Sequence, residues 1–438
     1  MGRTRRRVRK ESYRKRYTAL SVIEVKYLKD IEEAQIQLLK ENQLLPQQDR
    51  LPLVQILCIL EVMEAKKKAV AEMPDEYVFM RCPPRRYRTI ESFAECDCPT
   101  KFRFRTHSDL RRVLAALQLP AVCVLPNRSK VSGEELMLIG LRRMAFPSRY
   151  CDLIEEFGGD VSLWSRTFKY FIKHVYNKFG SLIVGGMEHW GDYFEDFGKA
   201  IKARLIKDGV THIRRTNAPM RIVAFIDCCI IKTGVAYGGP ADDGVGAARH
   251  DREIQQAFYT GYKKVHGLKF QDVTLPNGLV ADIFGPNSCR RSDAEMLLTS
   301  DLDHRVHRLL LEFADRQNDE QRKNMFKEFA IYGDSAYSTL HHVFGCHSGR
   351  NLTRAQISEN LGMAACRETI EWVHKDIKSK YAFINYFMDL KCTDDISKHV
   401  IIVATLLTNF YKCLYGCQTA EFFQCMPPTL EDYSDFVN

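Results

Sequence analysis

Three acidic residues, Asp227, Asp334 and Glu371, stand in settings from which their side chains could carry out chemistry. Asp227 closes the short apolar run 221–226, whose β-branched and aromatic residues predict a buried strand that ends at this carboxylate. Asp334 follows another apolar run that ends in glycine, which predicts a strand leading into a turn. Glu371 lies in residues 364–383, where the absence of Gly and Pro and the helical spacing of apolar residues predict a helix. Acids on strand ends and on a helix can converge in a folded chain.

The chemistry that such acids serve is the cleavage of phosphodiester bonds. Two divalent cations roughly 3.5–4 Å apart can stabilise both the attacking and the leaving oxygen of an in-line displacement. Mg²⁺ and Mn²⁺ prefer carboxylate oxygens to thiolates. One shared Asp and one flanking acid for each cation would leave positions open for water and phosphate, so these acids are candidate ligands.

Each acid has a simpler explanation when it is taken alone. An Asp at a strand end is most often a cap or turn residue. A Glu on a helix is more often part of a solvated face, and Glu368, one turn before Glu371, is a rival for its role. The ordered set favours the functional interpretation.

The segments between the acids predict a definite order of elements. Asn277-Gly278 predicts a tight turn with positive φ angles, joining a strand over 264–275 to a strand over 279–284. Residues 293–314 have apolar side chains at helical spacing. The order is strand, strand, strand, helix, strand, helix, as in an α/β ribonuclease H-like core, a mixed sheet flanked by helices.

The amino-acid sequences of several segments closely resemble those of one protein family. The segments are residues 257–271, 275–279, 284–286, 332–337 and 367–372. They resemble the PIF/Harbinger-type transposases of the DDE superfamily of endonucleases, and the resemblance covers roughly residues 220–433.

The resemblance implies an activity and a set of ligands. Asp227, Asp334 and Glu371 would bind the catalytic Mg²⁺ or Mn²⁺, and Asp293 is a candidate fourth ligand. The implied reaction is metal-dependent DNA strand cleavage and transfer at the ends of a transposable element, in the nucleus. A separate Myb-like DNA-binding protein is the partner that the resemblance implies.

Two departures from the family pattern bear on activity. Cys228-Cys229 follow Asp227 where relatives usually have Gly-Thr-His, and His374-Lys375 stand where relatives often have Phe-Gly. They keep a second hypothesis open, a domesticated or decayed transposase that acts as a catalytically inactive DNA-binding protein. A hydrolase of RNA or of small phosphoesters is a third.

Length and composition indicate a globular chain with more than one domain. Its 438 residues exceed what one core usually serves, and 45% hydrophobic with 27% charged residues is an ordinary globular composition. No run of about 18 apolar residues occurs, so we expect no membrane span. The chain begins with Arg and Lys rather than an apolar segment, so we expect no secretory signal and reduced thiols for its 15 cysteines. The cysteine pairs at 96/98 and 413/417 lack matching histidines, which argues against zinc knuckles.

The N-terminal part of the chain carries a dense positive charge. Residues 1–19 form a basic arm that suits nuclear import or phosphate binding, although a solubilising tail would have the same composition. Residues 20–44 and 51–73 predict helices, and the basic, Pro-containing residues 74–99 predict a linker.

Residues 108–179 predict helices over 108–119, 132–145, 148–157 and 160–179, with N-caps at Ser132, Ser148 and Asp160 and with Trp164, Phe168 and Phe171 in the core. Two short helices thus precede a longer one. This is a helix-turn-helix arrangement. Arg166, Lys169 and Lys173 on the last helix are candidate DNA contacts, although such units also serve as packing modules.

A second group of candidate DNA contacts lies beside the acids. Tyr262, Lys263 and Lys264 combine an aromatic face with basic groups, which suits nucleic acid, although a β-hairpin with solvated lysines explains them equally.

The sequence thus predicts a DNA-cutting enzyme with four regions. They are a basic arm (1–19), a helical pair with linker (20–99), a helical DNA-binding region (100–215) and a ribonuclease H-like DDE endonuclease domain (216–438). We expect DNA, both element ends and target, as the main partner, and a homo-oligomer.

Overall fold

The computed structural model describes residue 60 and residues 83–210, 214–215, 218–234, 255–337, 340–387, 390 and 395–437. The predicted arm 1–19, the helices predicted over 20–44 and 51–73, and the glycine-rich segment 235–252 lie outside the described residues, except for Leu60. Contacts divide the chain into Met1–Cys82 and Pro83–Asn438, and the following description concerns the second unit.

The helices of this unit form two groups along the sequence, one before the main sheet begins and one within and after it. Before the first strand of the main sheet come α3 (Cys98–Lys101), α4 (His107–Ala116), α5 (Gly133–Ala145), α6 (Tyr150–Phe157), α7 (Val161–Phe179) and α8 (Phe194–Lys207). Within and after the sheet come α10 (Asp293–Ser300), α11 (Leu302–Asp315), α12 (Glu320–Lys327), α13 (Arg354–Lys380), α14 (Asp395–Tyr415), α15 (Gln418–Phe423) and α16 (Leu430–Asp435). The 3₁₀ helices are η1 (Ile90–Ser92), η2 (Glu95–Asp97), η3 (Gly180–Leu182), η4 (Gly186–Tyr193) and η5 (Ala382–Asn385).

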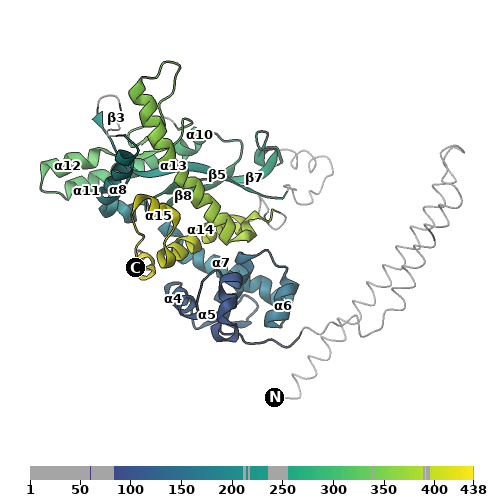
Figure 1. Ribbon diagram of the computed structural model, residues 1–438. Helices are drawn as coiled ribbons and strands as arrows, with labels where there is room; N and C mark the ends of the chain where they lie inside the picture. Colours follow the sequence, from purple (N-terminus) through teal and green to yellow (C-terminus); the bar gives the residue numbers. More distant parts are fainter. Residues whose placement is uncertain are drawn as a thin grey trace, which may run out of the picture. The chain divides into compact units, whose positions relative to one another are not determined.

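A six-stranded mixed sheet forms the centre of the unit (Figure 1). Its strands are β5 (Arg221–Lys232), β6 (Tyr259–Thr260), β7 (Val265–Thr274), β8 (Val280–Ser288), β9 (Phe329–Tyr332) and β10 (Val343–Phe344). The order is β10-β9-β5-β7, with β6 and β8 both pairing with β7. β5, β7 and β8 run antiparallel, and β9 and β10 run parallel to β5. The small pairs β1 (Val122–Val124) with β2 (Lys130–Ser132), and β3 (Arg214–Arg215) with β4 (Ala218–Pro219), stand apart.

Helices cover both faces of this sheet, because successive side chains of β5 point to opposite faces and both sets are apolar. Phe225 packs with side chains of α8, α13 and α15, including Ile201 and Ile370. Ile226 belongs to the core that holds Leu297 of α10 and Phe313 of α11. The mixed sheet with flanking helices is thus confirmed, and it is consistent with a DDE nuclease fold.

The predicted element order is confirmed, whereas several boundaries were wrong. β5 does not end at Asp227, because residues 228–232 continue to pair with β7. The helix predicted over 293–314 is broken at Asp301, which has a φ of 55°. In the β7–β8 turn only Gly278, with a φ of 82°, is left-handed, and its N–H donates to Leu275 O at 2.9 Å.

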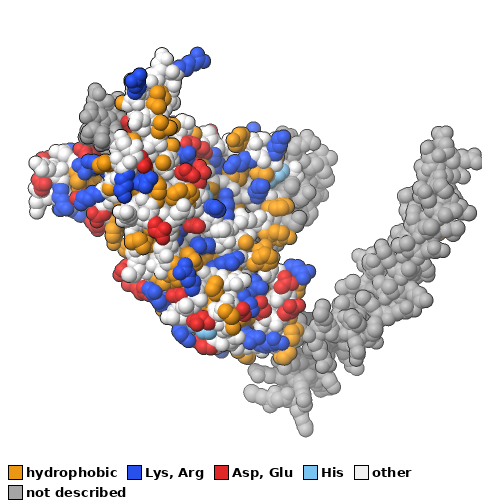
Figure 2. Space-filling view, viewed as in Figure 1, with side chains coloured by type: hydrophobic (Ala, Val, Ile, Leu, Met, Phe, Trp, Pro, Cys, Tyr) orange, Lys and Arg blue, Asp and Glu red, His pale blue; other side chains and the backbone are white. Residues whose placement is uncertain are grey.

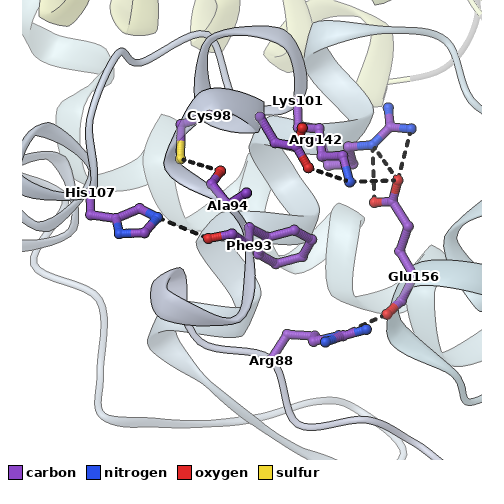
Figure 3. Close-up of polar contacts among 9 residues, drawn as sticks. Arg88, Phe93, Ala94, Cys98, Lys101, His107, Arg142 and Glu156 are labelled. Carbon is purple, nitrogen blue, oxygen red and sulfur yellow. Dashed lines mark hydrogen bonds and ion pairs between the residues drawn. The ribbon is translucent and has the colours of Figure 1, made fainter.

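Three predicted N-terminal helices lie close to their predicted bounds. The Oγ of Ser132 accepts from Glu135 N at 3.1 Å and caps α5, and Asp160 caps α7 in the same way. α6 begins at Tyr150 with Arg149 rather than Ser148 as its cap. Figure 3 shows how these helices are tied together: Glu156 of α6 accepts from Arg142 of α5.

The helical region packs directly on the elements that surround the sheet. Arg103 donates to Lys380 O at 2.7 Å, and the hydroxyl of Tyr415 donates to Asp109 at 2.7 Å. Phe168 of α7 packs on Phe383 with ring centroids 5.4 Å apart. The boundary predicted at residue 216 stays a prediction. Among the described helices, none is long and apolar enough to cross a membrane.

Candidate active site

The pairing of β5 with β9 places two of the predicted acids side by side. Phe225 lies opposite Tyr332 in this parallel ladder, and Asp227 and Asp334 each follow by two residues. Residues two apart share a face, and neighbouring strands are about 4.8 Å apart, so both carboxylates start from adjacent positions. Gly333 supports the continued register, since a Cβ there would meet Cγ2 of Ile226 at 2.9 Å.

The third acid, Glu371, reaches the same region from α13 through an arginine. The Nη1 of Arg367 lies 4.0 Å from Oδ2 of Asp227, and its Nη2 lies 3.9 Å from Oε1 of Glu371. The side chain of Glu371 is 59% exposed and that of Asp227 18%. One guanidinium therefore lies between two of the predicted ligands, at distances longer than a close ion pair.

Burial dominates the electrostatics of Asp227. Its Oδ1 accepts from Cys228 N at 2.8 Å, whereas Asp334 Oδ1 accepts from Ala336 N at 2.9 Å in the turn after β9. Burial raises the pKa of Asp227 to about 6, although His374 and Arg367 act in the opposite direction. A carboxyl that resists ionisation is one that gains from a nearby cation.

A neighbouring group on the same face was not predicted. Asp272 of β7 lies directly opposite Asp227, and His374 of α13 lies 2.7 Å from Oδ1 of Asp272 through its Nε2. Cys229, two residues after Asp227, is the third member. One signal was readable: His374 follows Glu371 by three residues and so shares its side of a helix. Asp272 depends on the register of β7, which the sequence does not reveal.

Asp293 lies apart from these acids. It pairs with Lys269 at 2.5 Å and interacts with Cys228, which points to the opposite face of β5 from Asp227. The described contacts therefore place the candidate fourth ligand on the α10 side of the sheet, although the hydroxyl of Tyr337 is near enough to interact with both Asp227 and Asp293.

Basic side chains line a groove along α13 next to Glu371. This open groove of about 450 Å³ is bordered by Glu371, His374, Lys375, Lys378, Ser379 and Asn385. The predicted contacts Tyr262, Lys263 and Lys264 form the exposed turn between β6 and β7, and Tyr262 is 92% exposed.

The predicted contacts on α7 line a second groove. It has a volume of about 520 Å³ and is lined by Pro126, Arg166, Lys169, Tyr170, Lys173, His174, Asn177 and Lys178. Trp164, Phe168 and Phe171 on the same helix are buried, as predicted for the core. On the face that Figure 2 shows, Lys and Arg side chains are scattered among acidic and apolar ones, so positive charge is local there.

The donor atoms of Asp227, Asp334 and Glu371 are of the type that Mg²⁺ and Mn²⁺ prefer, but their oxygens do not form a group within 4.8 Å of one another in the described structure. All of these donor atoms are carboxylate oxygens, the type that these hard cations prefer. Arg367 supplies positive charge where a cation would stand and would have to turn aside, which its ion-pair distances of 4.0 and 3.9 Å allow.

Comparison with known proteins gave one match. Residues 245–409 match the family model described as DDE superfamily endonuclease, a stretch that includes Asp334 and Glu371 and begins after Asp227. No curated protein and no solved structure gave a significant match. Over these residues the chain is similar to the DDE superfamily endonucleases, which suggests a transposase or nuclease function.

Proposed function

We propose that this protein is a PIF/Harbinger-type transposase that cleaves and transfers DNA strands with Mg²⁺ or Mn²⁺. The observation that supports the proposal is the β5–β9 register, in which Asp227 and Asp334 each follow the pair Phe225–Tyr332 by two residues. Arg367 lies 4.0 Å from Asp227 and 3.9 Å from Glu371. The match to DDE superfamily endonucleases over residues 245–409 supports it.

In this proposal the three acids have distinct positions. Asp227 of β5 would be the ligand shared between the cations, Asp334, just after β9, would bind one of them, and Glu371 of α13 would bind the other. The cations, when bound, activate the attacking oxygen and stabilise the leaving one. Arg367 lies near both Asp227 and Glu371 in the free protein and would offset part of their negative charge until cations bind.

The basic grooves provide a path for the DNA. Lys375 and Lys378 border the groove that begins at Glu371, so a phosphate backbone lying there would be neutralised next to the acids. Tyr262, at the exposed turn, offers a face on which an unpaired base can stack.

The α7 groove is the proposed site for binding element ends. α6 and α7 are separated by Gly158 and Gly159, with α7 as the recognition helix of a helix-turn-helix. Arg166, Lys169 and Lys173 would contact phosphates and base edges. We further propose a nuclear location, self-association and a Myb-like accessory protein.

Nicking of supercoiled DNA in Mn²⁺ tests the proposal. Wild type should nick, and Asp227→Ala should lose more than about 100-fold of the rate, the size of loss typical when a group that stabilises charge in the transition state is removed. Glu368→Gln, one turn from Glu371 on an exposed part of α13, is the matched control and should keep its rate.

Two other outcomes would overturn this proposal. Absence of nicking in wild type and in Asp227→Ala alike would favour the inactive DNA-binding protein. Cleavage of RNA without cleavage of duplex DNA would favour a ribonuclease or phosphoesterase.

A further inference from the structure

Three side chains at the contact between α13 and the sheet present a mixed set of donor atoms outside the proposed carboxylate site. The Sγ of Cys229, a carboxylate oxygen of Asp272 and a ring nitrogen of His374 all lie within 4.8 Å of one another. They come from β5, β7 and α13, so an ion held there would join two strands to the helix that carries Glu371.

One oxygen of this group is left without a partner. The side chain of Asp272 is 4% exposed, and its Oδ1 lies 2.7 Å from Nε2 of His374. Its Oδ2 is fully buried and has no hydrogen-bond partner among the described residues. An orphaned carboxylate oxygen is costly in an apolar interior, so the arrangement needs another positive group or donor.

The space beside these atoms is small and has an opening. A cavity of about 20 Å³ lies against all three residues, with its other walls formed mostly by apolar side chains: Ile231, Val280, Ile283, Ile377, Lys378, Ile384, Ile401 and Thr405. That volume holds one water. His374, whose side chain is 13% exposed, also borders the open groove along α13, so one side of its ring is accessible from solvent.

We propose that Cys229, Asp272 and His374 bind one Zn²⁺, with a water in the small cavity as fourth ligand. Thiolate, imidazole and carboxylate together are donors that select zinc rather than magnesium. Binding releases the Cys229 thiol proton and any proton on Nε2 of His374, and the ion replaces the hydrogen bond between His374 and Asp272. Nε2 and Oδ1 must then separate to roughly 3.3 Å, the spacing of two ligands on a tetrahedral zinc.

This site does not depend on the nuclease proposal. Its role is to fix α13 against the sheet and so to set the position of Glu371. Burial raises the pKa of the Cys229 thiol well above its usual range, and the charge of Asp272 adds to this, so the thiol is neutral until an ion arrives. Lys378, at the cavity wall, favours the thiolate.

Cobalt substitution of the reduced full-length protein provides the test. Co²⁺ bound to a thiolate absorbs in the near ultraviolet by sulfur-to-metal charge transfer, whereas Co²⁺ in a carboxylate site does not. We expect wild type to show this band at about one Co²⁺ per chain, with Zn²⁺ displacing it. The charge-transfer band reports on this zinc site and not on nuclease activity, whereas a loss of nicking reports on nuclease activity and not on the zinc site.

Two cysteine variants make the test specific. Cys229→Ser should abolish the band, whereas Cys228→Ser, the same one-atom change on the opposite face of β5, should keep it. Asp272→Asn and His374→Gln should weaken Zn²⁺ binding by at least tenfold, and Zn²⁺ should raise the melting temperature of wild type but not of Cys229→Ser. No band in wild type, or a band that survives in Cys229→Ser, would overturn the proposal.

Discussion

The two faces of β5 differ in how their charged groups are satisfied. On the face toward α10, the carboxylate of Asp293 pairs with Lys269, whose Nζ also donates to Arg291 O at 2.6 Å. Gln271 donates to Ser300, and its unpaired Oε1 belongs to a neutral amide. Charge on this face has been neutralised by the protein itself.

On the face toward α13 the charges are only partly satisfied. The Oδ2 of Asp272 has no hydrogen-bond partner within the described part of the chain. Burial raises the pKa of Asp227 to about 6, and Arg367 lies 4.0 Å from Asp227. The two faces of β5 therefore differ in how far the protein itself neutralises the charges on them. Negative charge that the chain does not neutralise can be stabilised by cations, so the α13 face is the one on which we propose the metal sites.

The largest expected effect concerns the buried pair on the α13 face. Burial lowers the pKa of His374, but Asp272 more than offsets this and leaves the pKa raised, so His374 keeps its proton to a higher pH than a free imidazole does. Asp272→Asn should lower the free energy of unfolding by roughly 3 kcal/mol at pH 6, because it leaves a buried cation without its partner. The loss should shrink as the pH rises through the pKa of folded His374, where the pair's contribution disappears.

Urea unfolding in EDTA at pH 6 and pH 9 measures this difference. Asp293→Asn is the counterpart on the other face and should cost less, because Lys269 keeps its bond to Arg291 O. Equal losses of unfolding free energy in the two variants would show that the two faces of β5 do not differ in this way.

The second effect is a gain in stability of the Asp227→Asn variant over wild type that appears only as the pH rises. The pKa of Asp227 is raised from its ordinary value to about 6, so its contribution to stability is fully present below pH 3.8 and is lost as the pH rises through 6. Asn does not titrate, so Asp227→Asn should unfold at a free energy up to roughly 3 kcal/mol higher than wild type at pH 8.

At pH 3, below both the ordinary and the raised pKa of Asp227, the same comparison should give almost no difference. Mg²⁺ should reduce the difference in the free energy of unfolding between Asp227→Asn and wild type at pH 8, because it stabilises only the ionised carboxylate of the wild type. A gap that is independent of pH would mean that burial of Asp227 does not control its protonation.

Much of this arrangement could be predicted from the sequence, because it depends on local patterns. Apolar runs and turn residues indicate β5, β7, β8 and β9, and helical spacing indicates α13, so the acids fall on the elements expected of them. The group of Cys229, Asp272 and His374 could not be predicted in this way. It exists because Asp227 pairs with Asp272 rather than with a neighbour, and a shift of one residue would move Asp272 to the other face.

The same limitation explains the misjudged end of β5. The sequence predicts that the strand ends at Asp227, since Asp is unfavourable in strand interiors. The partner strand outweighs that preference: residues 228–232 gain a full ladder with β7, and the thiols of Cys228 and Cys229 pack as small apolar groups.

A smaller effect should follow from removing the arginine between the acids. Arg367 occupies the charge position of a cation near Asp227 and Glu371. Arg367→Gln should tighten Mn²⁺ binding three- to tenfold, about 1 kcal/mol, when measured by calorimetry without DNA. Arg354→Gln, at the first residue of α13, is the matched control and should leave the affinity unchanged. Weaker binding in Arg367→Gln would show that the guanidinium organises the acids rather than competing with cations.

The smallest effect is expected at Asp293, and it sharpens the comparison because the sequence alone made this residue a candidate ligand. Its carboxylate is committed to Lys269, and it interacts with Cys228, whose side chain points away from Asp227. Asp293→Asn should therefore change Mn²⁺ affinity and the nicking rate less than threefold, below about 0.7 kcal/mol. A tenfold loss in either quantity would mean that Lys269 releases Asp293 when cations bind. The α10 face would then contribute to catalysis, and the division between the two faces of β5 would hold only for the metal-free protein.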